Sequence, residues 1–260
     1  MPGSRTFIFL GTGTSVGVPM LGCACAVCTS TDPRNHRYRC SVLIRTSQGN
    51  LLIDTTPELR LQLLRARIVL VHAVLFTHHH ADHLFGLDDL RPFPYYLGRP
   101  VPLYCDAQTE VAIRTAFAYA FTADSDTIRA GYVPQLDLHR ITSEPFRVLG
   151  LDVLPVPLEH GSFHVLGFRI DDVAYCTDVN GIPAESWGRL EGLRVLVLDA
   201  LRPRLHMGHF SLDQALEVCA RLKPVRTYLT HMSHELDHET TNRRLPAGIE
   251  LAYDGLTFEF

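Results

Sequence analysis

The sequence lacks a long apolar run. No stretch of its 260 residues approaches the roughly 18 uninterrupted apolar residues that a membrane-spanning helix needs. The first residues, MPGSRTFIFLGTGT, contain neither a long apolar segment nor a cleavage-site pattern, which predicts that there is no signal peptide. We therefore expect no membrane association and, by default, a cytoplasmic location.

Positive charge is also scarce. Lys and Arg number 24 against 28 Asp and Glu, so the net charge is −4 with neutral histidine. A chain without a broad cationic field is not expected to bind extended nucleic acid. A phosphate-binding P-loop is missing too, since GTGTSVG (11–17) lacks the Lys-Ser/Thr pair and the required spacing. We interpret this segment as a tight turn that lets the backbone pass close to a site.

Linkers, internal repeats and a disulfide pattern are likewise missing. We find no Ser/Gly-rich linker and no block of like charge, so we expect one domain that spans residues 1–260. The seven cysteines are odd in number and three of them cluster, which favours free thiols and metal binding over a disulfide framework. The other four, Cys40, Cys105, Cys176 and Cys219, lie in apolar patterns typical of core residues.

Short β-like runs alternate with a few helical segments. Helices are predicted over 55–66, 109–121 and 211–222, the last of which opens with a Ser-x-x-Gln capping box. The strands come in blocks rather than in strict alternation with helices, which favours an α/β fold of two stacked sheets with helices outside, an αββα sandwich. Strands are predicted over 6–10, 41–46, 50–55, 73–77, 101–105, 146–158, 167–170, 173–177, 195–199, 227–230 and 249–260.

The most unusual segment is THHHADH (77–83), directly after an apolar run. Neutral imidazoles and carboxylates are good ligands for zinc, manganese and iron. His78 and His80, two apart on an extended loop, can face one ion, and Asp82 and His83 follow where a helix can begin, directed toward a second ion. His79 has no such role and is expected to be exposed.

Further donors stand at the ends of later strands. His160 follows DVLPVPLE, Asp178 follows VAYCT, and His231 follows TYLT. A rigid strand that ends in a polar side chain is a common way to present a site. A catalytic pair of metals needs about eight donor positions, some of them open to water and substrate. These three residues are therefore candidate ligands beside the histidine segment.

A second candidate metal site is the segment GCACAVC, which contains Cys23, Cys25 and Cys28. Three thiolates so close together favour a closed tetrahedral zinc site, which needs a fourth ligand. His234 lies just after His231 and could complete a Cys₃His set. Such a site would connect the N-terminal loop to the active-site loop and hold His231 in place.

Together, these motifs resemble the metallo-β-lactamase superfamily and, within it, the PhnP-type phosphodiesterases. The shared segments are GTGTSVGVP, GCACAVC, RYRCSV, THHHADH, CTD and THMSH. The resemblance implies that His78, His80 and His160 bind one ion, that Asp82, His83 and His231 bind a second, and that Asp178 bridges them. It also implies manganese or zinc at this pair, a structural zinc on Cys23, Cys25, Cys28 and His234, and a homodimer.

The implied activity is hydrolysis of a small cyclic phosphodiester, such as phosphoribosyl cyclic phosphate or a 2′,3′-cyclic nucleotide, by a hydroxide that the two ions share. We assign catalytic roles to Asp82 and His209. His209 lies just before the helix predicted at 211, where backbone N–H groups favour anions, and could protonate the leaving oxygen. The roles of His206 and His238 stay open. Arg37 and Arg39 are expected to be exposed; they could touch a phosphate, but exposed arginines usually have no specific role.

Three alternatives remain. A tRNA 3′-processing endonuclease would use the same ligands and a similar GHFS segment, but this chain shows no long Gly/Pro-rich arm for gripping tRNA. A thiol-ester hydrolase would share the ligands without needing the cysteine site. A non-catalytic accessory protein of cofactor biosynthesis would have no reason to retain all seven donors.

Overall fold

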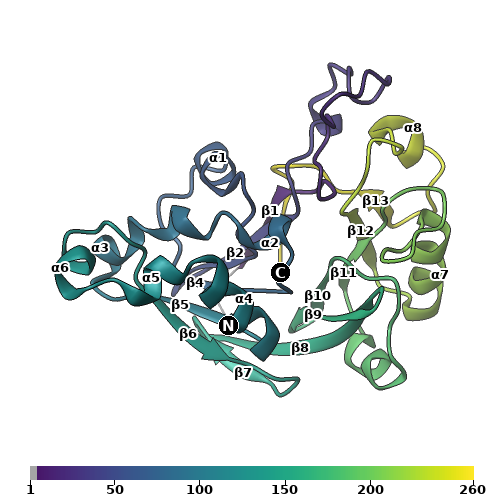
Figure 1. The fold of residues 1–260 in the computed structure, drawn as a ribbon. Helices are drawn as coiled ribbons and strands as arrows, with labels where there is room; N and C mark the ends of the chain where they lie inside the picture. The colour runs from purple at the N-terminus through teal and green to yellow at the C-terminus, as the bar shows by residue number, and fades with distance from the viewer. Residues whose placement is uncertain (1–4) are drawn as a thin grey trace.

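The computed structural model describes residues 5–260 as two β-sheets packed face to face, with helices on the outer face of each (Figure 1). The predicted α/β fold of the αββα type is confirmed. Each sheet has seven strands. Within the described residues, no helix is long and apolar enough to cross a membrane.

The first sheet contains the N-terminal strands and one strand from the C-terminus. Its first three pairings are antiparallel and its last three are parallel. In spatial order its strands are β14 (Thr257–Glu259), β1 (Thr6–Gly11), β2 (Ser41–Thr46), β3 (Gly49–Ile53), β4 (Ala73–Leu75), β5 (Val101–Cys105) and β6 (Leu136–Arg140).

The second sheet repeats this mixture, with three antiparallel pairings followed by three parallel ones. In spatial order its strands are β7 (Phe146–Val148), β8 (Leu151–His160), β9 (Phe163–Ile170), β10 (Val173–Cys176), β11 (Val195–Asp199), β12 (Arg226–Thr230) and β13 (Ile249–Leu251). The carboxyl ends of parallel strands are a common place for a site in α/β sheets.

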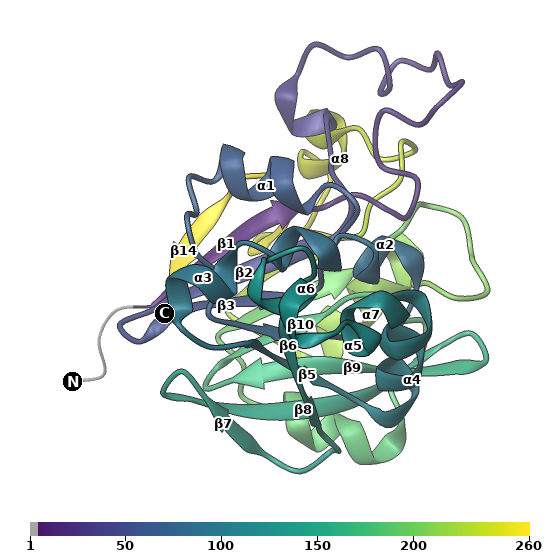
Figure 2. The ribbon, with the colours of Figure 1, turned by 60° about the vertical axis from the view of Figure 1, so that its left-hand side comes forward.

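The helices are short and lie on both outer faces (Figure 2). Those of the first half are α1 (Leu59–Arg65), α2 (Ala81–Leu84), η2 (Leu87–Leu90), α3 (Phe93–Leu97), α4 (Ala107–Ala116), α5 (Ala118–Thr122) and α6 (Ser125–Arg129). The others are η1 (Pro33–Asn35) in the N-terminal loop, then η3 (Ala184–Leu190), α7 (Leu212–Leu222) and α8 (His238–Asn242).

Alternation along the strands creates three apolar layers. Phe7, Phe9 and Leu51 point between the sheets and pack with Phe168 and Tyr175 of the second sheet. The intervening residues, such as Ile8 and Leu52, pack outward against α1 and α4. On the other side, alternate residues of β10 to β12 pack against α7. Two-residue alternation on strands buried on both faces thus accounts for the four layers.

The predicted strand 146–158 was wrong in one respect. The structure divides it into β7 and β8 because Leu149 and Gly150 adopt positive φ angles of 47° and 72° and form a turn. The run 249–260 is also two strands, β13 and β14, and these belong to different sheets. By contrast, the predictions 41–46, 101–105 and 195–199 match β2, β5 and β11 to the residue.

The helix predicted over 55–66 begins later, at Leu59. Thr55 is engaged elsewhere: its N–H donates to the His83 carbonyl oxygen (2.8 Å) and its hydroxyl donates to that of Leu84 (2.9 Å). These bonds attach the chain after β3 to α2, the helix that follows the histidine segment. The predicted helix 109–121 is interrupted at Phe117 into α4 and α5, whereas the capping box at Ser211 and Gln214 is confirmed.

Candidate metal centre

The seven predicted metal ligands meet at one place between the sheets, at the ends of their strands. The histidine segment follows β4, His160 ends β8, Asp178 follows β10 and His231 follows β12. Asp178 and His231 adopt positive φ angles of 52° and 58°, which non-glycine residues rarely do. These turns place both side chains in the cluster.

One half of the cluster consists of His78, His80, His160 and Asp178, whose ligand atoms all lie within 4.8 Å of one another. The Nε2 atoms of His78 and His160 each lie 3.9 Å from the same oxygen of Asp178. His80 is the N-cap residue of α2, so its extended backbone lets it face the same point as His78. This is the grouping that the resemblance implies for one ion.

The other half consists of Asp82, His83, His231 and again Asp178, also within 4.8 Å of one another. His83 Nε2 lies 3.1 Å from Asp178 and 3.3 Å from Asp82. His231 Nε2 lies 3.3 Å from Asp178. Asp178 therefore belongs to both halves, in the place that the resemblance gives to a bridging ligand.

Three of the histidine rings, those of His78, His83 and His160, are held by hydrogen bonds at Nδ1. The His83 ring donates from Nδ1 to Asp54 (2.8 Å), and the His160 ring donates from Nδ1 to the Gly208 carbonyl oxygen. Thr77 donates its hydroxyl proton to Asp54, so the same hydroxyl accepts from His78 Nδ1 (3.0 Å). In each ring the Nδ1 proton is therefore fixed, and the Nε2 lone pair is left to face the cluster.

The donor set fits divalent cations. The Nε2 atoms of His78, His83 and His231 are buried and have no hydrogen-bond partner within residues 5–260. The ion pairs that the described residues give Asp82 and Asp178 are with histidines alone. Buried carboxylates and unpaired imidazole nitrogens are costly unless a cation joins them, so these residues fit a pair of divalent metal ions.

The ionisation of the cluster agrees with this conclusion. Burial lowers the pKa of His78 well below its usual value, so its imidazole is neutral, as a metal ligand must be. Burial opposes the charge on Asp82, but His83 and His231 outweigh it and hold the pKa of that carboxyl well below its usual range. Burial disfavours imidazolium at His83 as well, yet Asp178, Asp82 and Asp54 raise its pKa well above 6.5.

Beside the cluster lies a buried His–Asp pair, of which the sequence analysis predicted His209 but not Asp199. His209 donates from Nδ1 to Asp199, the last residue of β11, at 2.7 Å, and its ring stacks on His231 at 4.6 Å between centroids. Burial alone would lower the pKa of His209, but the Asp199 carboxylate raises it to about 9. The N-terminus of α7 is closed by the Ser211–Gln214 capping box. The orientation of His209 therefore comes from Asp199 rather than from the helix.

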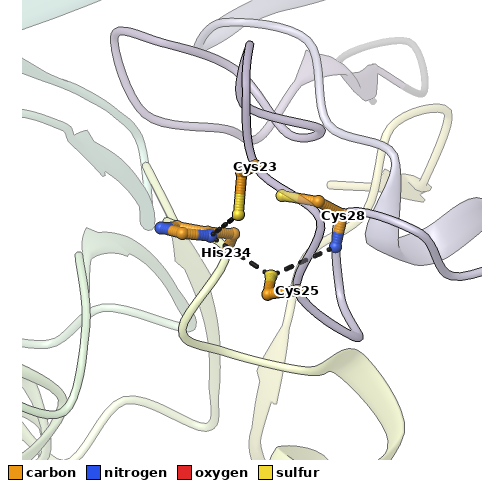
Figure 3. A group of neighbouring side chains, drawn as sticks. All are labelled: Cys23, Cys25, Cys28 and His234. Carbon is orange, nitrogen blue, oxygen red and sulfur yellow. Dashed lines mark hydrogen bonds between the residues drawn. The ribbon is translucent and has the colours of Figure 1, made fainter.

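Cys23, Cys25, Cys28 and His234 form the second group, at the end of the long N-terminal loop (Figure 3). Their ligand atoms lie within 4.8 Å of one another, and His234 Nδ1 lies 3.2 Å from Cys23 Sγ and 3.3 Å from Cys25 Sγ. The N–H of Cys28 together with His234 lowers the pKa of Cys25 to about 6, while burial raises that of Cys28 to about 11. Three thiols and one imidazole in this arrangement fit a closed zinc site.

The loop is attached to the active-site strand by hydrogen bonds as well. The Thr14 N–H donates to the Met232 carbonyl oxygen (3.1 Å), and the Met232 N–H donates to that of Thr12 (2.9 Å), next to His231. The expectation that Arg37 is exposed was wrong: it is 1 % exposed. It donates instead to the carbonyl oxygens of Ser233 (2.9 Å) and Leu236 (2.7 Å), on either side of His234. Arg37 thus holds the segment that contains both metal-binding histidines.

Two of the three glycines of GTGTSVG are required by close backbone approach. A Cβ on Gly11 would lie 1.9 Å from the Arg39 carbonyl oxygen, and one on Gly13 would lie 2.8 Å from that of Arg37. Arg39 is bonded to Ser15 and Glu58, so it does not point toward the cluster as a free cation. The start of the N-terminal loop, at Gly11 and Gly13, therefore packs closely against the backbone of Arg37 and Arg39 at the end of the same loop.

Other predictions have mixed outcomes. His79 is half-buried rather than exposed and packs against the Phe163 ring at 6.0 Å between centroids. His206 is on the surface and accepts a bond from the Gly208 N–H. His238 is buried on α8, on the side of the cysteine group. The four remaining cysteines, Cys40, Cys105, Cys176 and Cys219, are buried as predicted.

Asp54 and Asp199 are the site residues that the sequence analysis missed. Both stand where a buried apolar strand ends, in NLLID and VLVLD. This is the signal that identified His160, Asp178 and His231, and applying it to every strand would have found them. Asp54 also has a positive φ angle of 66°.

Together, the fold and the buried histidine–carboxylate cluster define a hydrolase of the metallo-β-lactamase fold with a metal-binding site. Residues 49–232 match the model of the β-lactamase superfamily domain. A crystal structure described as a new diphosphatase from the PhnP family is 44% identical, covers 100% of this chain and 98% of that chain, and superposes with a TM-score of 0.93. The chain belongs to the metallo-β-lactamase superfamily and, within it, to the PhnP-like proteins.

Two further relatives show how widely this domain is used. The octanoyltransferase of Porphyromonas gingivalis is 37% identical over 253 residues, which cover 96% of this chain and 50% of that protein. The chain thus spans about half the length of this curated relative. The zinc-bound PqqB of Methylobacterium extorquens covers 98% of this chain and 100% of that chain at 19% identity and a TM-score of 0.79, a likeness of fold.

Proposed function

We propose that this hydrolase is a metal-dependent phosphodiesterase that acts on small cyclic phosphodiesters. The observation that supports this most is the pair of four-donor groups that share Asp178, with the His209–Asp199 pair beside them. Two adjacent metal positions suit displacement at phosphorus, because they can stabilise the attacking and the leaving oxygen together. The diphosphatase activity in the description of the PhnP-family structure is also chemistry at phosphorus.

The residues that would hold the two ions are those of the two groups, with Asp178 common to both. When bound, a pair of manganese or zinc ions supplies an acidified water and withdraws charge from the phosphoryl oxygens. Asp82, whose carboxylate stays ionised, and neutral His78 are suited to holding the cations. Asp54 and Thr77 keep the imidazoles of His83 and His78 oriented for this role.

His209 is the residue proposed to move a proton. With its pKa raised to about 9 by Asp199, it is protonated at neutral pH. Its ring stacks on that of His231, and from this position it could donate a proton to the leaving oxygen of a bound substrate. Asp199 keeps Nδ1 of the ring occupied, so Nε2 is the atom that donates.

A separate zinc is proposed for the group formed by Cys23, Cys25, Cys28 and His234, with a structural role. The competing functions are less well supported. A non-catalytic accessory protein has no need for the His209–Asp199 pair, and the net charge of −4 does not favour a tRNA nuclease. The homodimer and the cytoplasmic location stay predictions.

The test is turnover of bis-p-nitrophenyl phosphate and of 2′,3′-cyclic nucleotides by protein reconstituted with manganese or zinc, alongside a tRNA precursor. We expect metal-dependent hydrolysis of the small diesters, abolished by chelation and by Asp178→Asn, with no cleavage of the precursor. Absence of phosphodiester turnover with either metal would overturn the proposal. Cleavage of the tRNA precursor at a comparable rate would favour the endonuclease instead.

A further inference from the structure

The rim of the metal cluster has an aromatic side chain that the proposed chemistry does not use. Phe163 is the first residue of β9, in the hairpin that begins with the candidate ligand His160. Its ring centroid lies 5.6 Å from that of His80 and 6.0 Å from that of His79, at 83° and 79° to their planes. The side chain is nevertheless 42 % exposed. A large part of an aromatic ring is thus open to solvent directly beside the cluster.

The segment opposite this hairpin is held in place by one asparagine. Asn180 accepts from the Gly161 N–H (2.7 Å) and donates to the Met207 carbonyl oxygen (2.9 Å). The exposed apolar residues of that segment are Leu205 and Met207, at 73 % and 88 % exposure. Two segments that border the candidate ligands therefore present apolar side chains. A purely polar substrate would make no favourable apolar contact with them.

The two arginines of the same segment, Arg202 and Arg204, are engaged in other contacts. Arg204 forms a two-pronged pair with Glu235, at 2.8 and 3.1 Å, and Arg202 donates to the Leu205 carbonyl oxygen and lies 3.8 Å from Glu235. Both are thus engaged by Glu235, in the segment that follows His231, and Arg202 also by the loop's own backbone. This rim is therefore not suited to following a nucleic-acid backbone.

Resting on the proposed function, we propose that Phe163 is a specificity-determining residue that stacks on a planar group next to the scissile phosphate, so that the substrate is a nucleotide-like phosphoester rather than a base-free sugar phosphate. A flat ring open on the rim gives stacking energy to a nucleobase of any sequence. A flexible acyl chain would require an enclosed apolar space. The apolar cavity of about 430 Å³ lies elsewhere, between α1 and the segment 88–93.

The experiment compares 2′,3′-cyclic AMP with glycerol 1,2-cyclic phosphate, which has the same five-membered phosphate ring and no base, on metal-loaded protein. Phe163→Ala should lower kcat/KM for cyclic AMP roughly tenfold to a hundredfold, the range of one stacked base, mainly through KM. The rate on glycerol cyclic phosphate should change less than twofold. Phe163→Tyr should retain the preference, and Tyr96→Ala, at an exposed aromatic of α3, should change neither substrate.

Equal losses on both diesters, or none on either, would overturn the inference while leaving the phosphodiesterase intact. Retention of the preference by Phe163→Leu would also overturn it, because an apolar but non-planar side chain would then suffice. If the wild-type protein turns over no diester, the proposed function fails separately. Calorimetry of AMP against ribose 5-phosphate then decides: a tenfold preference for AMP that Phe163→Ala removes supports stacking, and equal binding overturns it.

Discussion

The two clusters of candidate metal ligands in this chain are built in opposite ways. The histidine–carboxylate cluster collects its members from four separate strand ends, and Asp54, Thr77 and the Gly208 carbonyl orient three of its rings. The cysteine group lies on a loop, with three of its four members within residues 23–28, and His234 faces two of the thiols directly (Figure 3). The first cluster is therefore supported by the strands and their hydrogen bonds, whereas the second rests mainly on one short loop segment and His234.

This difference has a functional meaning. A preorganised cluster with ligand positions left open to substrate is what catalysis needs, whereas a closed Cys₃His set leaves no place for one. The two clusters are nevertheless three residues apart in the chain, at His231 and His234. Arg37 donates to carbonyl oxygens of this segment and connects it to the N-terminal loop. The first two predictions below separate the two clusters by changing one of them, and the last two concern residues that belong to neither.

The largest effect is expected from Asp178→Asn, since this residue belongs to both halves of the first cluster. Loss of its charge should reduce active-site metal and lower kcat/KM by at least about a thousandfold, the scale of several kcal/mol of electrostatic stabilisation. The cysteine zinc should remain. Metal analysis by mass spectrometry, with activity on bis-p-nitrophenyl phosphate, measures both quantities, and Asp152→Asn on the exposed part of β8 is the matched control. Wild-type metal content and activity in Asp178→Asn would contradict the shared-ligand assignment.

The reverse separation is expected from Cys28→Ser. This change should remove the structural zinc and destabilise the loop by an amount on the order of 2–5 kcal/mol, comparable with the loss of a covalent cross-link. Activity at low temperature should fall less than in Asp178→Asn, because the first cluster has its own supports. Zinc content and thermal unfolding check this, and Cys219→Ala, at a core cysteine outside both groups, should keep the zinc. An unchanged unfolding temperature after zinc loss would show that the hydrogen bonds of Arg37 and Thr14 suffice.

A smaller effect is expected from Asp199→Asn, which leaves every predicted metal ligand in place. The carboxylate is what raises the pKa of His209 to about 9 against burial. In the wild-type protein, a proton donated by His209 is available below this pH and is lost as the pH rises through about 9. In the variant that loss should move to lower pH, with a rate reduced by about a hundredfold at neutral pH and unchanged metal content. His206→Gln, at the exposed neighbour, is the control, and an unshifted alkaline limb in Asp199→Asn would remove His209 from the proton step.

The sequence predicted those parts of the fold and of the candidate site that depend on residues close together in the chain. The strands 41–46, 101–105 and 195–199 are short apolar runs with clear ends, and His160, Asp178 and His231 stand at such ends, so pattern and position together place them. Arg37 was misjudged because its burial results from the return of residues 233–236 from nearly 200 residues away. The strand β6 was missed because it is an edge strand with polar residues on its exposed face.

The smallest expected effect concerns the pH dependence of the free energy of unfolding that His238 of α8 causes. His238 is 3 % exposed on α8, and burial with the charges of Arg34 and Arg37 lowers its pKa to about 4. Its pKa is about 6.5 in an unfolded chain, so the folded state binds the proton less readily. The stability that this provides is fully present above pH 6.5 and is lost as the pH falls toward 4. Between pH 7.5 and 5.5 the free energy of unfolding of zinc-saturated protein should therefore fall by about 1.4 kcal/mol more in the wild type than in His238→Gln. Denaturant titrations at the two pH values measure this difference. Equal losses of stability in both proteins would show that His238 is open to solvent in solution, so that α8 is packed less firmly than the first cluster.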